Sequence, residues 1–205
     1  MKISDCDAVI LCGGKGTRIK HMLPDGTPKA MADINGKPFI EVLIGRLKAE
    51  GFEKFTLCVG YGQDQIVETV CKNELAMFCC EHKQFGTGGA LRMMLRSPAI
   101  QLSDPFFIFN GDTICEQVPY GYALGMHEWH EHRRALLTTL RFKHANIGTF
   151  IVSHAIVPVL EWEPRESFNI EELPIHLAVS IVGVNEPFLD IGTPAGLMAA
   201  RERYK

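Results

Sequence analysis

The chain has 205 residues, of which 46% are hydrophobic and 22% charged, and its formal net charge is −3. This balance is typical of a globular protein, and the absence of a basic excess argues against nucleic acid as a partner. No apolar run approaches the roughly 18 residues of a membrane span, and no signal-peptide pattern follows Met1. The seven cysteines include no C-x-x-C pair. We therefore expect reduced thiols and a cytoplasmic protein without a membrane partner.

Short apolar runs alternate with helical patterns along the first 140 residues. The predicted strands are 8–12, 31–34, 55–59, 75–80, 105–109 and 135–140, and the predicted helices are 39–48, 63–70, 90–96 and 119–132. This alternation predicts a doubly wound, mostly parallel α/β sheet. In such a sheet the functional groups lie beyond the carboxyl ends of the strands.

The remaining residues are less regular, and no repeat or long linker interrupts them. We expect strands at 148–152, 179–184 and 188–191, and helices at 155–161, 170–177 and 194–203. The histidine-rich string H-E-W-H-E-H at 127–132 lacks the H-E-x-x-H spacing of a zinc protease, so it predicts a solvated helix face.

The first predicted strand ends in a glycine-rich loop that also carries basic residues. Glycines at 13, 14 and 16 precede Thr17 and Arg18, and Lys29 follows eleven residues after the arginine. Glycine lets backbone N–H groups approach a phosphate, and fixed cations neutralise its charge. The loop is not a Walker A motif. Ile19 stands where a dinucleotide fingerprint needs its third glycine, which argues against a nicotinamide-dependent oxidoreductase.

The string G-G-x-G-T-R followed by P-K-x-M resembles the nucleotidyltransferases that join a nucleoside triphosphate to a sugar 1-phosphate. The string G-T-G-G-A at 86–90 is similar to that of the branch of D-glycero-α-D-manno-heptose 1-phosphate guanylyltransferases. The resemblance implies a Rossmann-like nucleotidyltransferase fold with a short sugar-binding C-terminal portion. It also implies one domain over 1–205, in which 1–140 bind the nucleotide and 141–205 bind the sugar phosphate and supply a second metal ligand. A homodimer is expected from the resemblance alone.

The resemblance assigns the triphosphate to residues of the first and second glycine-rich strings. Arg18 would orient the β- and γ-phosphates, and Lys29 would compensate charge at the α-phosphate. The implied nucleotide-binding residues are Leu11, Cys12, Gly13, Gly14, Gly16, Thr17, Glu81, Gly86 and Thr87. Glu81 holds the position of the family's base-reading residue. A carboxylate only accepts hydrogen bonds, so guanine, with donors at N1 and N2, is favoured, while cytosine and uracil stay open.

Two further strings supply carboxylates. Asp112 follows a buried strand in N-G-D-T, where an acidic side chain is well placed to bind a divalent cation. It resembles the family's magnesium-binding aspartate, and Asp190 in D-I-G-T-P resembles the second ligand, so Mg²⁺ is the expected cofactor. The residues implied for the sugar phosphate are Asn110, Gly111, Asn146 and Gly148.

The sequence departs from the family between Leu140 and Asn146. Relatives insert a sugar-facing hairpin there, which ends in an E-K-P-like string whose lysine contacts the sugar phosphate. Here the segment is short, and Arg141 and Lys143 are the candidates to replace that lysine. Two alternatives to a GTP-dependent enzyme stay open: the same chemistry with CTP or UTP and another phosphorylated acceptor, and an inactive nucleotide-sugar-binding regulatory subunit.

Overall fold

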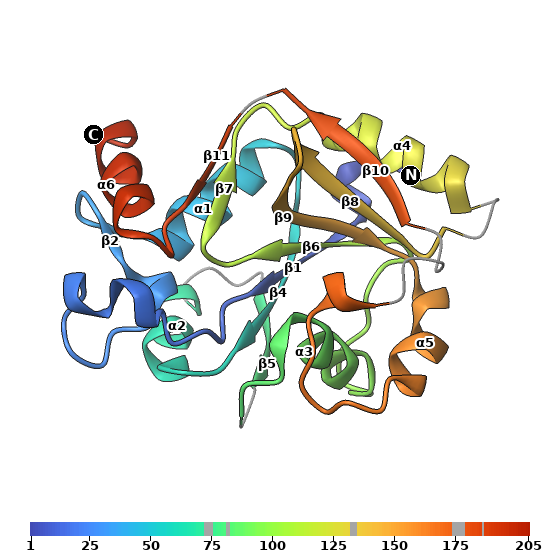
Figure 1. Cartoon of the computed structure of the whole chain (residues 1–205), viewed down its shortest axis with the longest axis horizontal. Helices are drawn as coiled ribbons and strands as arrows, with labels where there is room; N and C mark the ends of the chain where they lie inside the picture. The colour runs from blue at the N-terminus through green and yellow to red at the C-terminus, as the bar shows by residue number, and fades with distance from the viewer. Residues whose placement is uncertain (72–75, 81–82, 132–134, 174–178, 186) are drawn as a thin grey trace.

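The computed structural model describes residues 1–71, 76–80, 83–131, 135–173, 179–185 and 187–205. Its main sheet has seven strands in the order β10-β8-β9-β6-β1-β4-β5 (Figure 1). The strands are β1 (Asp7–Leu11), β4 (Lys54–Val59), β5 (Ala76–Cys80), β6 (Phe106–Asn110), β8 (Leu137–Phe142), β9 (Ala145–Val152) and β10 (Val179–Val184). Only β9 runs antiparallel to its neighbours, so the predicted mostly parallel sheet is confirmed.

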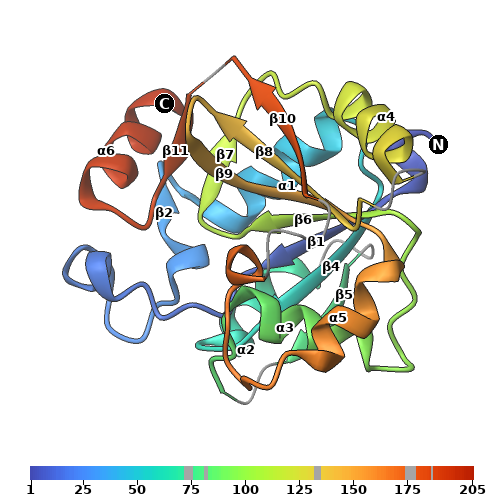
Figure 2. The same cartoon turned by 45° about the vertical axis from the view of Figure 1, so that its right-hand side comes forward.

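Helices cover both faces of this sheet and define two hydrophobic cores. On β1, Ile10 belongs to one core and Val9 to the other, because successive side chains of a strand point to opposite faces. The first core receives side chains from α1 (Phe39–Ala49), α2 (Gln63–Val70), α4 (Tyr120–Glu131) and α6 (Pro194–Arg203). The second receives them from α3 (Gly86–Leu95) and α5 (Val157–Trp162), which lie together in Figure 2. No helix among the described residues has the length and apolar character needed to cross a bilayer.

Short elements complete the chain. The short strands are β2 (Asp33–Ile34), β3 (Lys37–Pro38), β7 (Thr113–Cys115) and β11 (Phe188–Asp190). The 3-10 turns are η1 (Ile3–Asp5), η2 (Thr17–Met22), η3 (Lys29–Met31), η4 (His154–Ile156) and η5 (Ile170–Glu172). β2 pairs with β3 and β7 pairs with β11, each antiparallel and outside the main sheet.

Most predicted elements are found, and two predictions need correction. Helix α3 begins at Gly86, four residues before the predicted start, because the glycine run that suggests a loop is itself helical. The predicted helix at 170–177 is wrong at its start: the chain makes only the turn η5 and is extended at Leu173. The following Pro174 disfavours the helical conformation at Leu173. Residues 174–178 lie outside the described residues.

A cluster of aromatic rings packs against β6, the strand that leads to Asp112. The ring of Phe52 lies 5.0 Å from that of Phe107 and 5.4 Å from those of Phe109 and Tyr120, in edge-to-face arrangements. Phe52 is almost fully buried. Edge-to-face ring pairs stabilise the fold beyond the contribution of the buried apolar area, so Phe52 holds β6 in place from the side of the first core.

Replacing Phe52 with alanine should lower the free energy of unfolding by about 3–5 kcal/mol, because the large cavity left cannot collapse fully. Phe52→Leu, which keeps more of the volume, should cost less. The measurement is urea denaturation of both variants at an unchanged m-value. A loss for Phe52→Ala below about 1 kcal/mol, the typical effect of a point mutation, would contradict this role.

His127 of α4 is fully buried, which corrects the expectation that it lies on a solvated face. Its Nδ1 lies 2.8 Å from Thr138 Oγ1 on β8, and its Nε2 lies 2.9 Å from Ser153 Oγ, just after β9. Ser153 Oγ also donates to Glu131 Oε1 at 2.8 Å. Burial lowers the pKa of His127 below its usual value, despite the opposing effect of nearby carboxylates. The side chain is therefore neutral, and its hydrogen bonds connect α4 to the sheet.

Protonation of His127 should destabilise the fold at acidic pH. Between its folded pKa and about 6.5, the unfolded chain binds a proton that the folded imidazole does not, so stability rises with pH. The free energy of unfolding should therefore fall as pH drops from 7 towards 5. In His127→Gln, the part of this pH dependence that comes from protonation of His127 should disappear. The difference between the pH profiles of the variant and the wild type measures that part. Identical profiles would show that His127 does not contribute.

Candidate active site

A cavity of about 410 Å³ opens at the carboxyl ends of β1 and β6, beside the N-terminus of α3. Its lining combines glycines, small polar side chains, one lysine and one aspartate. The lining residues are Leu11, Cys12, Gly13, Gly14, Lys29, Ala30, Gln84, Gly86, Thr87, Ala90, Asn110, Gly111, Asp112, Ser167 and Asn169. The three glycine-rich strings therefore meet in one place, as the strand order predicts.

The loop after β1 folds back on Lys29. Gly111 N donates to Leu11 O at 2.9 Å, which joins the ends of β1 and β6 at the floor of the cavity. Gly16 has φ +62°, and a Cβ there would lie 2.8 Å from Lys29 Cβ. Both the left-handed conformation and the close approach require glycine. The loop then enters η2, where the side chain of Arg18 is 63% exposed.

Lys29 and Asp112 form an ion pair at the edge of the cavity. Their side chains are only 19% and 15% exposed. Thr113 Oγ1 donates to the other carboxylate oxygen of Asp112 at 3.1 Å. A partly buried pair is screened less by solvent than a surface pair, so a strong local field acts at this point.

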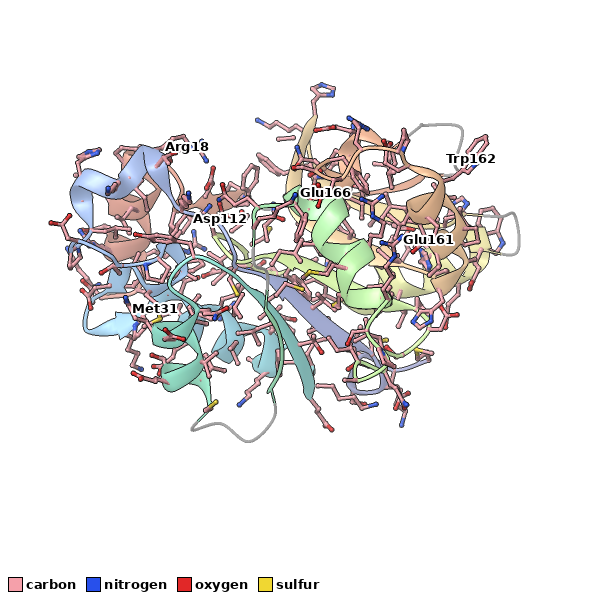
Figure 3. The ribbon with its side chains drawn as sticks, turned by 90° about the horizontal axis from the view of Figure 1, so that it is seen from below. Arg18, Met31, Asp112, Glu161, Trp162 and Glu166 are labelled. Carbon is pink, nitrogen blue, oxygen red and sulfur yellow. The ribbon has the colours of Figure 1, made fainter. Side chains whose placement is uncertain are left out.

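Asp190 reaches the same point through the pairing of β7 with β11. The register places Asp190 opposite Thr113, and Ile191 N donates to Asp112 O at 2.9 Å. Arg18 Nη2 lies 3.6 Å from Asp190 Oδ2. Figure 3 labels Arg18 and Asp112, with η2 on one side of the site and Glu166, beside α3, on the other.

The two carboxylates converge on Gly192. A Cβ at this glycine would lie 2.8 Å from Asp190 Oδ1 and 3.1 Å from Asp112 Oδ2. Among the residues that the structure describes, no group of three or more histidine, cysteine or acidic side chains forms a metal site. Two carboxylate oxygens fit a hard divalent cation whose other ligands are phosphate oxygens and water. The donor set therefore fits such a cation together with a phosphorylated substrate.

The N-terminus of α3 is closed by a distant segment. Gly88 N and Gly89 N donate to Phe168 O at 3.0 and 3.3 Å, and Phe168 N donates to Phe85 O at 2.9 Å. Thr87 Oγ1 accepts from Ile170 N at 2.9 Å. Figure 2 shows this segment, which leads into η5, lying across α3. Gly86 and Thr87 therefore line the cavity, whereas the two glycines that follow bind the segment.

The structure brings most of the predicted site residues together. Ten line the cavity: Leu11, Cys12, Gly13, Gly14, Lys29, Gly86, Thr87, Asn110, Gly111 and Asp112. Gly16, Thr17, Arg18 and Asp190 lie around it without lining it. Glu81 lies outside the described residues.

Asn146 and Gly148 occupy the start of β9, next to the cavity. Gly148 has φ +70°, and a Cβ there would lie 2.7 Å from Asn110 Nδ2. Asn146 Oδ1 accepts from Gly148 N at 2.8 Å, and Asn146 Nδ2 donates to Glu171 Oε1 at 3.5 Å. These two predicted residues therefore extend the site across β9.

Five further lining residues are not among the predicted site residues: Ala30, Gln84, Ala90, Ser167 and Asn169. Ala30 and Ala90 lie within the strings P-K-x-M and G-T-G-G-A, and Gln84 lies two residues before Gly86, so the position of these three next to predicted site residues could have indicated them. Ser167 and Asn169 follow α5 and reach the cavity only because their segment closes α3, which no local pattern reveals.

Comparisons with known proteins agree with this geometry. The family of MobA-like NTP transferase domains matches residues 8–145. D-glycero-alpha-D-manno-heptose 1-phosphate guanylyltransferase of Campylobacter jejuni is 38% identical over 109 residues, which are 52% of this chain and 47% of that protein. The bifunctional protein GlmU of Methanococcus maripaludis is 37% identical over 110 residues, 54% of this chain and 25% of that protein. The chain thus spans about half or less of these relatives.

Solved structures resemble the chain over nearly its whole length. The crystal structure of HddC from Yersinia pseudotuberculosis complexed with GMP-PN has a TM-score of 0.77 and 27% identity, and covers 98% of this chain and 100% of that one. The inositol-1-phosphate CTP transferase from T. maritima has a TM-score of 0.74 at 15% identity, covers 97% of each chain, and shows the fold alone.

Gly88→Ala should disturb the cavity from the α3 side. Its Cβ would lie 2.3 Å from the ring of Phe168, so the segment that carries Ser167 and Asn169 must shift. We expect the affinity for a nucleoside triphosphate, measured by calorimetry, to fall about tenfold or more. The reason is that a small displacement of residues that position a ligand has an effect of this order. Gly121→Ala in α4, where nothing lies within 4 Å of the new Cβ, is the matched control and should bind normally. Equal affinities would contradict the role of the segment.

Proposed function

Because the chain belongs to the family of MobA-like NTP transferase domains, we propose that it is a sugar-1-phosphate nucleotidylyltransferase. It joins a nucleoside triphosphate, with GTP favoured, to a sugar 1-phosphate of the heptose or mannose type. The products are an NDP-sugar and pyrophosphate. The observation that carries this proposal is the convergence of Lys29, Arg18, Asp112 and Asp190 beside a cavity of about 410 Å³.

The reaction is an in-line displacement at the α-phosphorus. An oxygen of the acceptor phosphate forms the new P–O bond, the bond between the α-phosphorus and the bridging oxygen breaks, and pyrophosphate leaves with that electron pair. Little covalent chemistry falls to the protein, so positioning and charge stabilisation dominate. The ammonium of Lys29 compensates charge at the α-phosphate. Arg18, exposed on η2, binds the β- and γ-phosphates that leave.

Asp112 and Asp190 would hold Mg²⁺. Such an ion would supply positive charge that neutralises the phosphate groups of the substrate. In the structure each carboxylate faces a cationic side chain instead, Lys29 for Asp112 and Arg18 for Asp190. The cluster therefore balances its own charge before substrate and metal arrive. Asp112 would hold the cation, and the ammonium of Lys29 would bind the α-phosphate.

The similarity of the chain to two D-glycero-alpha-D-manno-heptose 1-phosphate guanylyltransferases supports GTP as the donor. The alternatives are CTP or UTP with another phosphorylated acceptor. An inactive nucleotide-sugar-binding subunit is a further alternative, but the four charged residues meet in one centre, which such a subunit does not need.

We propose that residues 1–140 bind the nucleotide, and that residues 141–205 of the same domain bind the acceptor and supply Asp190. A cytoplasmic location and a homodimer complete the proposal.

Removing the ammonium of Lys29 should slow the reaction strongly. Loss of one preorganised charge typically costs about 10²- to 10³-fold in rate, and we expect Lys29→Ala in that range and Asp112→Asn at least as low. Lys20→Ala, which removes an exposed lysine of η2, the turn that also carries Arg18, should keep full activity. Steady-state pyrophosphate release measures all three. Near-native turnover by Asp112→Asn would overturn the metal assignment.

A substrate panel tests the function itself. Each of the four triphosphates is incubated with Mg²⁺ and mannose 1-phosphate or a heptose 1-phosphate, and pyrophosphate release is recorded. Release with GTP alone, abolished by a chelator, is the expected result. Release with another triphosphate would keep the mechanism and correct the base. Triphosphate binding without release from any pair would favour the inactive binding subunit.

A further inference from the structure

Buried polar atoms without partners gather on the acceptor side of the cavity. Among the described side chains, five buried nitrogen or oxygen atoms make no hydrogen bond. Three of them, Asn110 Oδ1, Thr139 Oγ1 and Arg141 Nε, lie on this part of the sheet, whereas Arg46 Nε on α1 and His154 Nε2 in η4 lie elsewhere. Asn110 lines the cavity, and Thr139 and Arg141 lie on β8. Buried polar groups are normally hydrogen-bonded, so each such atom requires an explanation. A polar ligand on this part of the sheet would satisfy all three.

Arg141 lies on the same face of the sheet as the cavity. Its neighbour Leu140 packs in the first core, so Arg141 projects from the opposite face, the one covered by α3 and α5. The neighbouring strand, β10, places Gly183 opposite Arg141, and a Cβ at this glycine would have nothing within 4 Å. With respect to the residues that the structure describes, the space beside Gly183 is therefore open on the β10 side of Arg141.

The backbone register connects Arg141 to the reaction centre. Arg141 pairs with Asn146 on β9, Asn146 hydrogen-bonds to Gly148, and Gly148 packs against Asn110. Neighbouring strands lie about 4.8 Å apart, so β8 is only about 10 Å from β6, across β9. An arginine side chain together with a phosphate can bridge that span. In the sheet, β8 lies on one side of β6 and β1, which leads to Arg18, lies on the other, and this order suits an acceptor phosphate and a leaving pyrophosphate in line.

The charges of the site favour an anion at Arg141. Arg18 and Lys29 each face a carboxylate, whereas Arg141 makes no ion pair with the residues that the structure describes. Glu171, the carboxylate beside Asn146, contacts Thr87 instead. A guanidinium presents a planar set of donors that matches phosphate, so an arginine with a free buried N–H is a suitable phosphate ligand.

Lys143 lacks these properties. It lies in the two-residue turn between β8 and β9 with φ +55°, and its side chain is exposed. Its ammonium lies 5.2 Å from the centre of the Phe142 ring, on the neighbouring residue. The turn is the whole connection between the two strands, so the structure holds no sugar-facing hairpin there. Of the two candidates from the sequence, only Arg141 has a buried, unpartnered donor, and it lies on the face of the sheet that carries the cavity.

We propose that Arg141 binds the phosphate group of the acceptor and positions it for attack on the α-phosphorus. This inference rests on the function proposed above and names the residue that replaces the hairpin lysine of relatives. Asn110, whose unpartnered Oδ1 lies in a side chain that lines the cavity, would accept a hydrogen bond from a hydroxyl group of the acceptor. The acceptor subsite therefore extends from the cavity over β9 to β8.

The test compares Arg141→Ala, Arg141→Lys and Lys143→Ala with the wild type. We expect Arg141→Ala to raise the KM for mannose 1-phosphate about 10- to 100-fold, in the range typical for loss of a charge-assisted phosphate contact, with the KM for GTP unchanged. Arg141→Lys should recover part of the loss, and Lys143→Ala should match the wild type. Thermal unfolding of each variant shows whether the fold is retained.

A merely structural role would change the two KM values together or lower the melting temperature, and either result would overturn the proposal. An unchanged KM for mannose 1-phosphate in Arg141→Ala would also overturn it. If the wild type shows no turnover, calorimetry with mannose 1-phosphate in the presence of a non-hydrolysable GTP analogue replaces kinetics. Binding that is lost in Arg141→Ala and kept in Lys143→Ala would support Arg141 even if the transfer function failed. Equal binding by both variants would refute it.

Discussion

The antiparallel pairing of β7 with β11 is the contact on which the candidate site depends. It joins two segments separated by more than seventy residues and places Asp190 opposite Thr113, one residue after Asp112. The ladder is only three residues long, so it is stabilised from outside: Ile114 and Ile191 are buried in the first core, and α6 packs behind β11. A one-residue slip would turn the carboxylate of Asp190 to the other side of the strand.

Charge compensation explains how two acidic side chains coexist at this point. Lys29 and Arg18 come from the loop after β1, and each faces one carboxylate. Like charges brought together in a partly buried site repel each other unless cations intervene. Under the proposed function, the same lysine and arginine are the phosphate ligands, and the structure shows both of them in ion pairs.

The acceptor side of the site is built differently. There the surface of the sheet forms a platform made by three neighbouring strands, with Asn110 on β6, Asn146 and Gly148 on β9, and Arg141 on β8. Glycine at position 148 lets β9 approach Asn110 closely. The segment that closes α3 forms the opposite wall and brings Ser167 and Asn169 to the cavity. Under the proposed function, the acceptor binds between this platform and the segment that closes α3.

The sequence by itself determined the family, the alternation of strands and helices, and the strings that supply Lys29, Asp112 and Asp190, because each of these is encoded by neighbouring residues. The chain's membership of the nucleotidyltransferase family is confirmed by the comparisons, and the order of elements by the sheet. Only the tertiary structure decided that His127 is buried, that the glycines after Thr87 bind the segment at Phe168, and that Arg141 Nε is buried without a partner while Lys143 is exposed. These outcomes depend on which strand neighbours which and in what register. Such pairings are set by the packing of distant residues, and no local pattern of side chains records them.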